Sequence, residues 1–419
     1  MLDTYKQNLN LHSQSELVLG LSGGLDSVVA LYLASKLDVP VTAVYVDHGL
    51  SANSSKWMLH CAQLCHEMDV RFVAEKVTMS PELGNVEMQA RVKRYQVLEG
   101  YIDTPNKVLV TGHHRDDLAE TFLLAMKRGS GVDGLASMPF SKPFGEGCHR
   151  RPLLSFSKKE LMLFASSRSL TWVEDESNED NKYDRNFLRN TVIPLLDSRW
   201  ENVSKSIARS AELCAANRKV MEELLSEKLE LVVHKGVFDL DKLLSERPSK
   251  ELVFEMVRQW LRTQGIAQLP SRKKMNEFWS VFTNAKSGSS PVLRLSDTKN
   301  LRQYKGCLHV VSSELKLKEA TDILCHLFDV EPSDQLLIAD VELEIRRDNS
   351  YDYLPNRSSY AIAYGGDGVK VSRNGYNTPM NFHLHVHGVP PWLRPFVPRV
   401  YVDDKLVYVG VVGFVAVRD

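Results

Sequence analysis

A short motif near the start of the chain has the composition of an anion-binding site. The residues Ser22-Gly23-Gly24-Leu25-Asp26-Ser27 stand between an apolar run at 17–21 and a helix-forming run at 28–34. A strand, a glycine turn and a helix start would offer unpaired backbone N–H groups to a phosphate, which glycine allows to approach closely. The Asp26 carboxylate and the hydroxyls of Ser22 and Ser27 could hold a metal ion or cap the helix.

Two further polar groups follow runs that look like buried strands. Asp47 and His48 follow 41–46, and Gly112-His113-His114-Arg115-Asp116-Asp117 follows 107–111. Ligands of open parallel sheets bind beyond the carboxyl ends of the strands. Asp47 and His48 are therefore placed to meet the ribose or base of a nucleotide, although Asp47 could equally cap its loop. For His113 and Asp117, metal binding, acid–base catalysis and phosphate contact all remain open.

Two other segments carry conspicuous charge. Glu87, Arg91 and Arg94 recur at helical spacing and share one face, which by itself favours a solvated, ion-paired surface. The segment 172–190 is acidic first and basic afterwards, and it has little apolar content before Phe187. Either a flexible surface loop or a substrate-binding loop fits this pattern.

Elements that alternate between strand and helix patterns must position these residues. The first ~115 residues predict strands at 17–21, 41–46, 70–73 and 107–111 with helices between them, which is typical of a parallel α/β sheet. The stretch 139–147 is rich in Pro and Gly and predicts a loop. A helical pattern over 200–233 predicts a long linking helix.

The remainder of the chain predicts two smaller domains. We expect an ATP-binding domain at 1–205, a mostly helical middle domain at 206–315, a linker at 314–332, and a β-rich domain at 335–419 with strands at 336–338, 341–346, 400–402 and 406–414. Arg272, Lys273 and Lys274 stand at a helix start, where they oppose the helix dipole, so they are candidates for nucleic-acid contact. His383, His385 and His387 alternate as in a strand and could share one face, but no acid or thiol nearby completes a metal site.

Composition limits the setting of the protein. The chain has 419 residues, which suggests two or three domains, and its net charge of −1 means that any nucleic acid must be bound by local basic patches. Six cysteines form no C-x-x-C pair, which favours free thiols in a reducing compartment. Neither a signal peptide nor a run of membrane-spanning length is seen, so we expect a cytoplasmic protein without membrane association.

Several motifs occur together in a way that is typical of one family. They are SGGLDS from Ser22, VDHGL from Val46, GNVEMQAR from Gly84, TGHHRDDLAETFLL from Thr111, KRGSGVDGLASM from Lys127, RRPLL from Arg150, W-x-E-D-x-S-N from Trp172, and GVPPWLRP followed by LVYVGVVG near the end. With these the chain resembles the bacterial tRNA(Ile)-lysidine synthases, members of the pyrophosphate-loop ATP pyrophosphatase superfamily. The resemblance is thin from 235 to 330, and the stretch 383–387 departs from it.

The resemblance implies a fold, a reaction and partners. It implies an adenine nucleotide alpha hydrolase-like domain that uses ATP and Mg²⁺ to adenylate C2 of the wobble cytidine in the CAU anticodon of tRNA(Ile). The amine of free L-lysine then displaces AMP, which leaves lysidine and changes codon specificity from AUG to AUA. A homodimer is compatible with this resemblance.

The resemblance also implies roles for individual residues. Residues 22–27 would bind the phosphates, Asp26 would hold Mg²⁺, and Asp47 and His48 would border the adenosine. Arg91 would stabilise charge on the phosphoryl group, while His113 and Asp117 would orient the nucleotide or the amine. Carboxylate candidates for the lysine substrate are Asp116, Asp117, Glu120, Glu174 and Asp175, and candidates for tRNA contact are Arg185, Arg189, Arg272, Lys273 and Lys274.

Three alternatives compete with this hypothesis. A tRNA thiolase of the same superfamily would commonly need a cysteine pair near its motifs. A serine hydrolase could use Ser22, because Gly20-Leu21-Ser22-Gly23-Gly24 matches G-x-S-x-G, but that elbow normally follows several strands. A nucleotide-binding regulator without chemistry would not require the ionisable residues Asp26, Arg91, His113 and Asp117.

Overall fold

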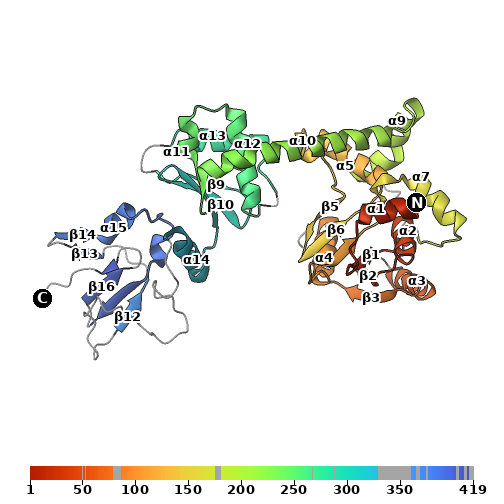
Figure 1. Ribbon diagram of the computed structural model, residues 1–419, viewed down its shortest axis with the longest axis horizontal. Coiled ribbons are helices and arrows are strands. Elements are labelled where there is room, and N and C mark those ends of the chain that lie inside the picture. Colours follow the sequence, from red (N-terminus) through yellow and green to blue (C-terminus); the bar gives the residue numbers. More distant parts are fainter. Residues whose placement is uncertain are drawn as a thin grey trace. The chain divides into compact units, whose positions relative to one another are not determined.

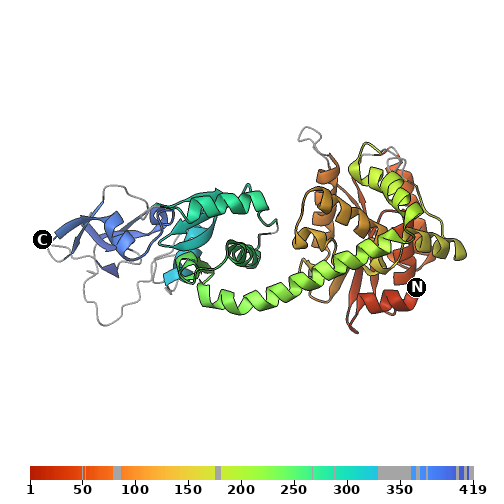
Figure 2. The ribbon, with the colours of Figure 1, turned by 90° about the horizontal axis from the view of Figure 1, so that it is seen from above.

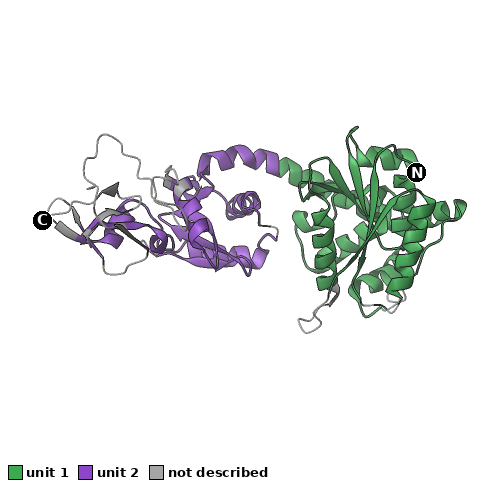
Figure 3. Cartoon of the chain, turned by 90° about the horizontal axis from the view of Figure 1, so that it is seen from below, with its two compact units in different colours: residues 1–221 green, residues 222–419 purple. Residues whose placement is uncertain are grey.

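The computed structural model divides into two compact units, Met1–Met221 and Glu222–Asp419 (Figure 3). It describes residues 1–49, 51, 53–78, 86–174, 181–266, 268–285, 289–328, 360–364, 369–373, 376–402, 405–409 and 413–414. The expected Asp175, Gly84 and Asn85 and the strands at 336–338 and 341–346 lie outside these residues.

The first unit is built on a six-stranded sheet in the order β3-β2-β1-β4-β6-β5 (Figure 1). Its strands are β1 (Glu16–Leu21), β2 (Val41–Asp47), β3 (Arg71–Lys76), β4 (Lys107–Val110), β5 (Ser141–Phe144) and β6 (Gly147–Arg150). All neighbours pair in parallel except β5, which runs antiparallel to β6. The parallel α/β domain expected from the alternating pattern is therefore confirmed.

Helices cover both faces of this sheet (Figure 3). They are α1 (Leu2–Leu9), α2 (Leu25–Ala34), α3 (Ser54–Glu67), α4 (Val86–Gly100), α5 (Arg115–Lys127), α6 (Val132–Leu135), η2 (Pro152–Ser155), α7 (Lys158–Ser167), α8 (Asp184–Phe187), the π-helical turn η4 (Leu188–Val192) and α9 (Ile193–Arg199). α2 is buried on nearly every side and packs in the main core of the unit.

The order of the strands decides where a ligand can bind. β1 pairs with β2 on one side and with β4 on the other, so the chain changes direction across the sheet between β1 and β4. Ligands of open α/β sheets bind at such a point, beyond the carboxyl ends of the strands. The SGGLDS motif follows β1 and the TGHH motif begins where β4 ends, which brings both to this edge.

The loop expected at 139–147 is wrong. This stretch contains β5 and the turn into β6, with Gly145 at a φ of +53°. Pro143 is tolerated because β5 is the edge strand of the sheet, where one side of the backbone has no partner strand. The hairpin brings Lys142 and His149 toward α4, a consequence that the Pro/Gly pattern did not predict.

The long helix α10 (Val203–Val232) continues from the first unit into the second (Figure 2). Ala208 and Ala211 are buried near its start, and Leu225 and Leu229 are buried near its end. The expected linking helix is confirmed, and its two buried stretches belong to different hydrophobic cores.

In the second unit, the described residues form a helical layer and three antiparallel sheets. A five-stranded sheet, β7-β8-β11-β10-β9, packs with α11, α12 and α13 around Phe238, Trp260 and Phe278. Beyond it lie a four-stranded sheet, β12-β15-β16-β17, and the pair β13-β14. The bounds are β7 (Val233–His234), β8 (Val237–Asp239), α11 (Leu240–Ser245), α12 (Lys250–Thr263), α13 (Arg272–Phe282), β9 (Val292–Arg294), β10 (Lys299–Tyr304), β11 (Cys307–Ser312), α14 (Leu317–Phe328), β12 (Tyr360–Ala363), β13 (Lys370–Arg373), β14 (Tyr376–Pro379), α15 (Met380–Val386), η5 (Arg394–Phe396), β15 (Arg399–Val402), β16 (Lys405–Val409) and β17 (Gly413–Phe414).

Three local expectations in the second unit are wrong. The histidine-rich stretch 383–387 is not a strand: α15 reaches Val386, and Met380 and Leu384 are buried at helical spacing. His383, His385 and His387 therefore do not share one face as they would in a strand. The linker expected at 314–332 contains α14, and the strand expected at 406–414 is divided into the paired strands β16 and β17.

Candidate active site

The SGGLDS motif forms a tight turn at the amino end of α2. Gly24 is the residue before the helix, and Gly23 has a φ of +83°. The backbone N–H of Ser22 donates to Ser27 Oγ at 3.2 Å, and that hydroxyl donates to the carbonyl of Gly24 at 2.9 Å. Ser22 Oγ also lies 3.2 Å from Ser27 Oγ. The hydroxyls thus fix the turn, while the first N–H groups of α2 remain available for an anion.

A second glycine joins this turn to the TGHH motif. A Cβ placed on Gly112 would come within 2.7 to 2.9 Å of the backbone of Asp26 and Ser27. Backbone atoms cannot yield as a flexible side chain can, so only glycine permits this approach. The absence of a side chain at Gly112 lets the end of β4 lie directly against the first turn of α2.

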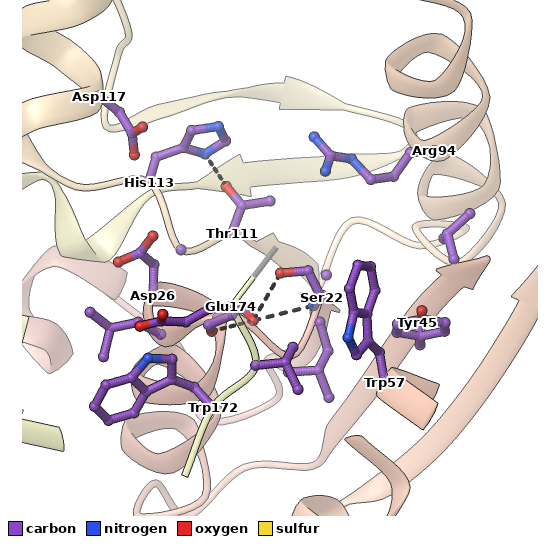
Figure 4. A pocket seen from close by; sticks show the side chains of 18 of the residues that line it. Ser22, Asp26, Tyr45, Trp57, Arg94, Thr111, His113, Asp117, Trp172 and Glu174 are labelled. Carbon is purple, nitrogen blue, oxygen red and sulfur yellow. Dashed lines mark hydrogen bonds between the residues drawn. The ribbon is translucent and has the colours of Figure 1, made fainter. Parts of the chain in front are cut away.

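These segments surround a cavity of about 730 Å³ within the first unit. Figure 4 shows Tyr45 and Trp57 on one side of Ser22, and Asp26, His113 and Asp117 on the other. Trp172 and Glu174 also line the cavity, and the N–H of Val173 donates to the carbonyl of Gly23 at 2.9 Å. The ionisable end of the cavity, with Asp26, His113 and Asp117, therefore also carries Trp172, while Tyr45, Trp57 and Arg94 lie on the other side of Ser22 (Figure 4).

Asp26 presents an unsatisfied carboxylate oxygen at the ionisable end. Its Oδ1 is buried, and none of the described residues donates a hydrogen bond to it. Its Oδ2 lies 3.6 Å from His114 Nε2. Burial raises the pKa of Asp26, and Asp117 adds to the rise, while His114, Lys158 and Arg189 oppose it. A buried acceptor without a donor is costly, so the site favours a bound cation.

The two adjacent histidines have different roles. His114 is buried and caps α5: its Nδ1 accepts from the N–H of Asp116 at 3.2 Å. Its Nε2 lies between Asp26 and Asp117, 3.6 and 3.5 Å from their Oδ2 atoms. His113 lines the cavity instead, and its Nδ1 lies 2.7 Å from the hydroxyl of Thr111.

Asp47 and His48 follow β2, as the sequence predicted. Asp47 Oδ1 accepts from the N–H of Gly49 at 2.8 Å, so Asp47 does cap its loop. His48 lines the cavity, and its Nδ1 is buried without a hydrogen-bond partner among the described residues. Burial lowers the pKa of His48, and Arg94 contributes to that change. A neutral imidazole with a free nitrogen can accept or donate one hydrogen bond to a ligand.

Of the two arginines on α4, it is Arg94 that lines the cavity. Arg91 is exposed, and its guanidinium lies 5.2 Å from the centre of the Tyr95 ring, with Arg94 5.5 Å from the same ring. Burial lowers the pKa of Arg94, and Arg91 and Arg185 lower it further. The sequence grouped these arginines on one face but did not identify Arg94 as the one that lines the cavity.

A buried ionic cluster closes the same end of the site. Glu120 is completely buried and receives Arg185 Nε at 2.7 Å and Arg189 Nε at 2.6 Å. Asp117 Oδ1 receives Arg185 Nη2 at 3.0 Å and Arg189 Nη2 at 3.1 Å. Each arginine thus bridges two carboxylates of α5. The pairs join α5 to α8 and η4, and Arg185 and Glu120 are 65 residues apart in the sequence.

This cluster settles the ionisation of Asp117. Burial alone would raise the pKa of Asp117, but His114, Arg185 and the backbone N–H of His114 lower it to about 2. Asp117 is therefore an anion near neutral pH, and its oxygens are occupied by Arg185, Arg189 and His114. The sequence predicted both Asp117 and Arg185 as functional, but it could not show that they neutralise each other.

The remaining basic candidates lie in the second unit, on α13. Arg272 pairs with Glu251 at 2.9 Å and lies 4.9 Å from the Phe254 ring centre. Lys274 pairs with Glu277 at 3.2 Å. Lys273 is exposed. None of the described helices is both long and apolar enough to span a membrane.

Sequence reasoning missed several residues of the site. Arg94, Lys158, Trp57 and Met162 line the cavity, and His149 is fully buried behind it. No local pattern distinguishes them, because they come from helices and a hairpin that only the packing of the unit brings to the sheet edge. The sequence motifs identified the SGGLDS and TGHH loops, whose backbones contact each other at Gly112.

Comparison with known proteins gives a consistent result over both units. The PP-loop domain family matches residues 2–196, and the TilS substrate binding domain family matches residues 243–309. The tRNA(Ile)-lysidine synthase of Proteus mirabilis is 38% identical over 421 residues, which cover 97% of this chain and 92% of the relative. That of Haemophilus ducreyi is 39% identical over 432 residues, with 97% of each chain covered.

A solved structure shares a smaller part of the chain. The U34-tRNA thiolase NcsA from Methanococcus maripaludis aligns with a TM-score of 0.43 and 20% sequence identity, covering 51% of this chain and 78% of that one. A similarity at this level supports no inference about function.

We expect the substitution Glu120→Gln to destabilise the first unit by about 3 kcal/mol, because it leaves Arg185 and Arg189 with Asp117 as their one shared carboxylate and so leaves a buried positive charge uncompensated. Asp184→Asn is the matched control: it breaks the surface pair Lys127–Asp184, in which both side chains are 63% exposed, and should cost at most about 1 kcal/mol. Urea unfolding of both variants measures the difference. Equal losses would show that the buried cluster contributes no more than a surface pair.

Proposed function

Since the chain belongs to the tRNA(Ile)-lysidine synthase family, we propose that it uses ATP to join free L-lysine to C2 of the wobble cytidine in the CAU anticodon of tRNA(Ile). It is a carbon–nitrogen ligase that modifies tRNA. AMP and pyrophosphate leave, and codon specificity changes from AUG to AUA. The observation that carries this proposal is the SGGLDS turn at the start of α2. Its residue Asp26 lines the same cavity as His113 and Arg94. The cytoplasm is the expected compartment.

The lining of the cavity supports a binding mode in which different parts of ATP lie at different ends. The N–H groups at the start of α2 are suited to the phosphates. Tyr45 and Trp57 lie on the other side of Ser22 from Asp26 (Figure 4), and His48 also lines the cavity; aromatic rings and an imidazole nitrogen without a described partner fit an adenosine. Arg94 of α4 lines the cavity and is suited to stabilise negative charge on the phosphoryl group. Arg91 lies against the same Tyr95 ring as Arg94.

Asp26 has the donor chemistry that Mg²⁺ requires. Its Oδ1 is buried and lacks a hydrogen-bond partner, and a carboxylate oxygen is a preferred Mg²⁺ ligand. Among the described residues no group of three or more His, Cys, Asp or Glu side chains could hold a metal by itself, which suits an ion shared between one carboxylate, water and nucleotide phosphates. When bound, Mg²⁺ would neutralise charge on the phosphates.

The lysine substrate needs a carboxylate to receive one of its ammonium groups. Asp117 and Glu120 are occupied by arginines, and Asp116 Oδ2 accepts from the N–H of Lys158 at 2.8 Å. Glu174 lines the cavity and is exposed there, and Asp175 lies outside the described residues. Among the candidates that the structure describes, we propose Glu174 as the carboxylate that receives the lysine ammonium.

The competing hypotheses lack support in the site. Cys61 and Cys65 are buried in α3, and burial raises the pKa of each thiol to about 12, so neither is an activated thiolate for sulfur transfer. A serine nucleophile would require a histidine base beside its hydroxyl. The hydroxyl of Ser22 contacts that of Ser27 instead. The charged and unsatisfied groups around the cavity favour catalysis over simple nucleotide binding.

The purified protein should transfer labelled lysine to unmodified tRNA(Ile) when ATP and Mg²⁺ are present. Asp26→Asn should lower this rate at least about 100-fold, because the charge that holds the cation is lost. Asp38→Asn, at an exposed carboxylate of the same unit, should leave the rate unchanged. Absence of transfer by the wild-type protein would refute the activity, and full activity of Asp26→Asn would refute only the Mg²⁺ role.

Glu174→Gln should raise the KM for lysine about tenfold, since a charged hydrogen bond worth at least about 1.4 kcal/mol is removed. The KM for ATP should stay constant in the same assay. Glu146→Gln, an exposed carboxylate in the turn before β6, serves as the control. An unchanged KM for lysine would exclude Glu174 as its ligand.

Substituting Arg272, Lys273 and Lys274 together by glutamine should weaken tRNA binding and make it less sensitive to salt. Each phosphate contact contributes about 0.7 to 0.9 to the slope of log K against log salt. Because Arg272 and Lys274 already pair with acids, Lys273→Gln alone should account for most of the change. Titrations over a range of salt, with Lys6→Gln as control, measure it, and an unaltered slope would remove α13 from the tRNA interface. We also propose that Arg185 and Arg189 support tRNA binding by the first unit, because they hold α8 and η4 against α5.

A further inference from the structure

A chain of hydrogen bonds runs behind His113 through side chains that have no role so far. Arg151 Nη2 lies 3.2 Å from His149 Nδ1, His149 Nε2 lies 2.8 Å from Thr111 Oγ1, and Thr111 Oγ1 lies 2.7 Å from His113 Nδ1. Figure 4 shows the last of these bonds, between Thr111 and His113. Arg151, His149 and Thr111 are all buried, with exposed fractions of 5%, 0% and 8%.

The first link of this chain has only one possible direction. A guanidinium donates hydrogen bonds and cannot accept them, so His149 Nδ1 must be the acceptor. Burial lowers the pKa of His149 to about 2, and Arg151 beside it acts in the same sense, so the ring is neutral. A neutral imidazole that accepts at Nδ1 carries its proton at Nε2. His149 therefore donates to the hydroxyl of Thr111.

The second link follows from the single hydrogen of a hydroxyl. Thr111 Oγ1 accepts from His149, and its own hydrogen is then free to be donated to His113 Nδ1. If His113 were protonated at Nδ1, two donors would face the hydroxyl oxygen and the hydroxyl hydrogen would have no acceptor in a buried site. An unpaired buried donor costs about 1 to 3 kcal/mol, so the directional arrangement is favoured. His113 then accepts at Nδ1 and carries its proton at Nε2.

We propose that Arg151, acting through His149 and Thr111, holds His113 in the Nε2–H tautomer, so that His113 offers the cavity a hydrogen-bond donor and not a general base. Thr111, His149 and Arg151 are positioning residues, and His113 is the residue that meets an oxygen acceptor of the substrates. None of the described residues forms a hydrogen bond with His113 Nε2, and His113 lines the cavity. The part of this inference that concerns the reaction rests on the proposed function, whereas the tautomer does not.

The tautomer can be measured without any substrate. In the full-length protein labelled with ¹⁵N-histidine, long-range ¹H–¹⁵N spectra distinguish the two tautomers, and the signals of His113 are identified by their loss in His113→Gln. We expect the Nε2–H form in the wild type and in Thr111→Ser, which keeps the hydroxyl. Thr111→Val keeps the shape and removes the hydroxyl, so it should populate the Nδ1–H form.

A wild-type His113 in the Nδ1–H form would overturn the proposal, as would an unchanged tautomer in a folded Thr111→Val. Because the wild-type spectrum and Thr111→Ser each give a result, the proposal is falsifiable even if Thr111→Val fails to fold. These outcomes are independent of lysine transfer, so they are distinguishable from a failure of the proposed function.

The donor role is tested in the lysine-transfer assay by matched substitutions at residue 113. The amide nitrogen of glutamine can take the place of Nε2–H as a donor, whereas glutamine cannot act as a base. His113→Gln should therefore retain at least tenfold more kcat than His113→Ala. Thr111→Val should lower kcat about tenfold with the KM for ATP unchanged, and Thr111→Ser should restore it. Equal loss in His113→Gln and His113→Ala would show that a base is required and overturn the donor role.

Discussion

The active site depends on a backbone contact between two loops that are far apart in the sequence. Gly112, just beyond β4, lies against the backbone of Asp26 and Ser27 in the first turn of α2. This contact exists because β1 and β4 are neighbours in the sheet and because glycine has no Cβ. It sets the spacing between the phosphate-binding turn, the Asp26 carboxylate and His113, so the whole reaction centre rests on one position without a side chain.

The charged side chains around this contact fall into two groups, those that neutralise one another and those that do not. The carboxylates of Asp117 and Glu120 are neutralised by Arg185 and Arg189, and these ion pairs join α5 to α8 and η4. Among the described residues, Arg94 pairs with no carboxylate and lines the cavity, while Asp26 keeps a buried oxygen to which none of them donates a hydrogen bond. The cluster that is neutral overall stabilises the structure. The groups that are not neutralised are the ones suited to phosphates and a cation.

Neutral side chains complete this arrangement. His113 and His149 are kept uncharged by burial and by nearby arginines, with pKa values lowered to about 3 and about 2. Their imidazoles act through hydrogen-bond direction, which Arg151 determines because it can only donate. A site that handles polyphosphate thus contains fixed cations, fixed anions and oriented neutral groups, each defined by its neighbours.

The sequence alone determined the parallel domain, the glycine turn before α2, the long helix and the family, because strand and helix periodicity and contiguous motifs are local properties. It also indicated Asp26, His48 and His113, which line the cavity, since each lies shortly after a predicted strand. Only the tertiary structure decided that Arg94 lines the cavity, that Arg185 and Arg189 neutralise Asp117 and Glu120, and that His149 orients His113. Those pairings join residues up to about 70 positions apart, and no local pattern encodes which distant charge or hydrogen bond a buried group will meet.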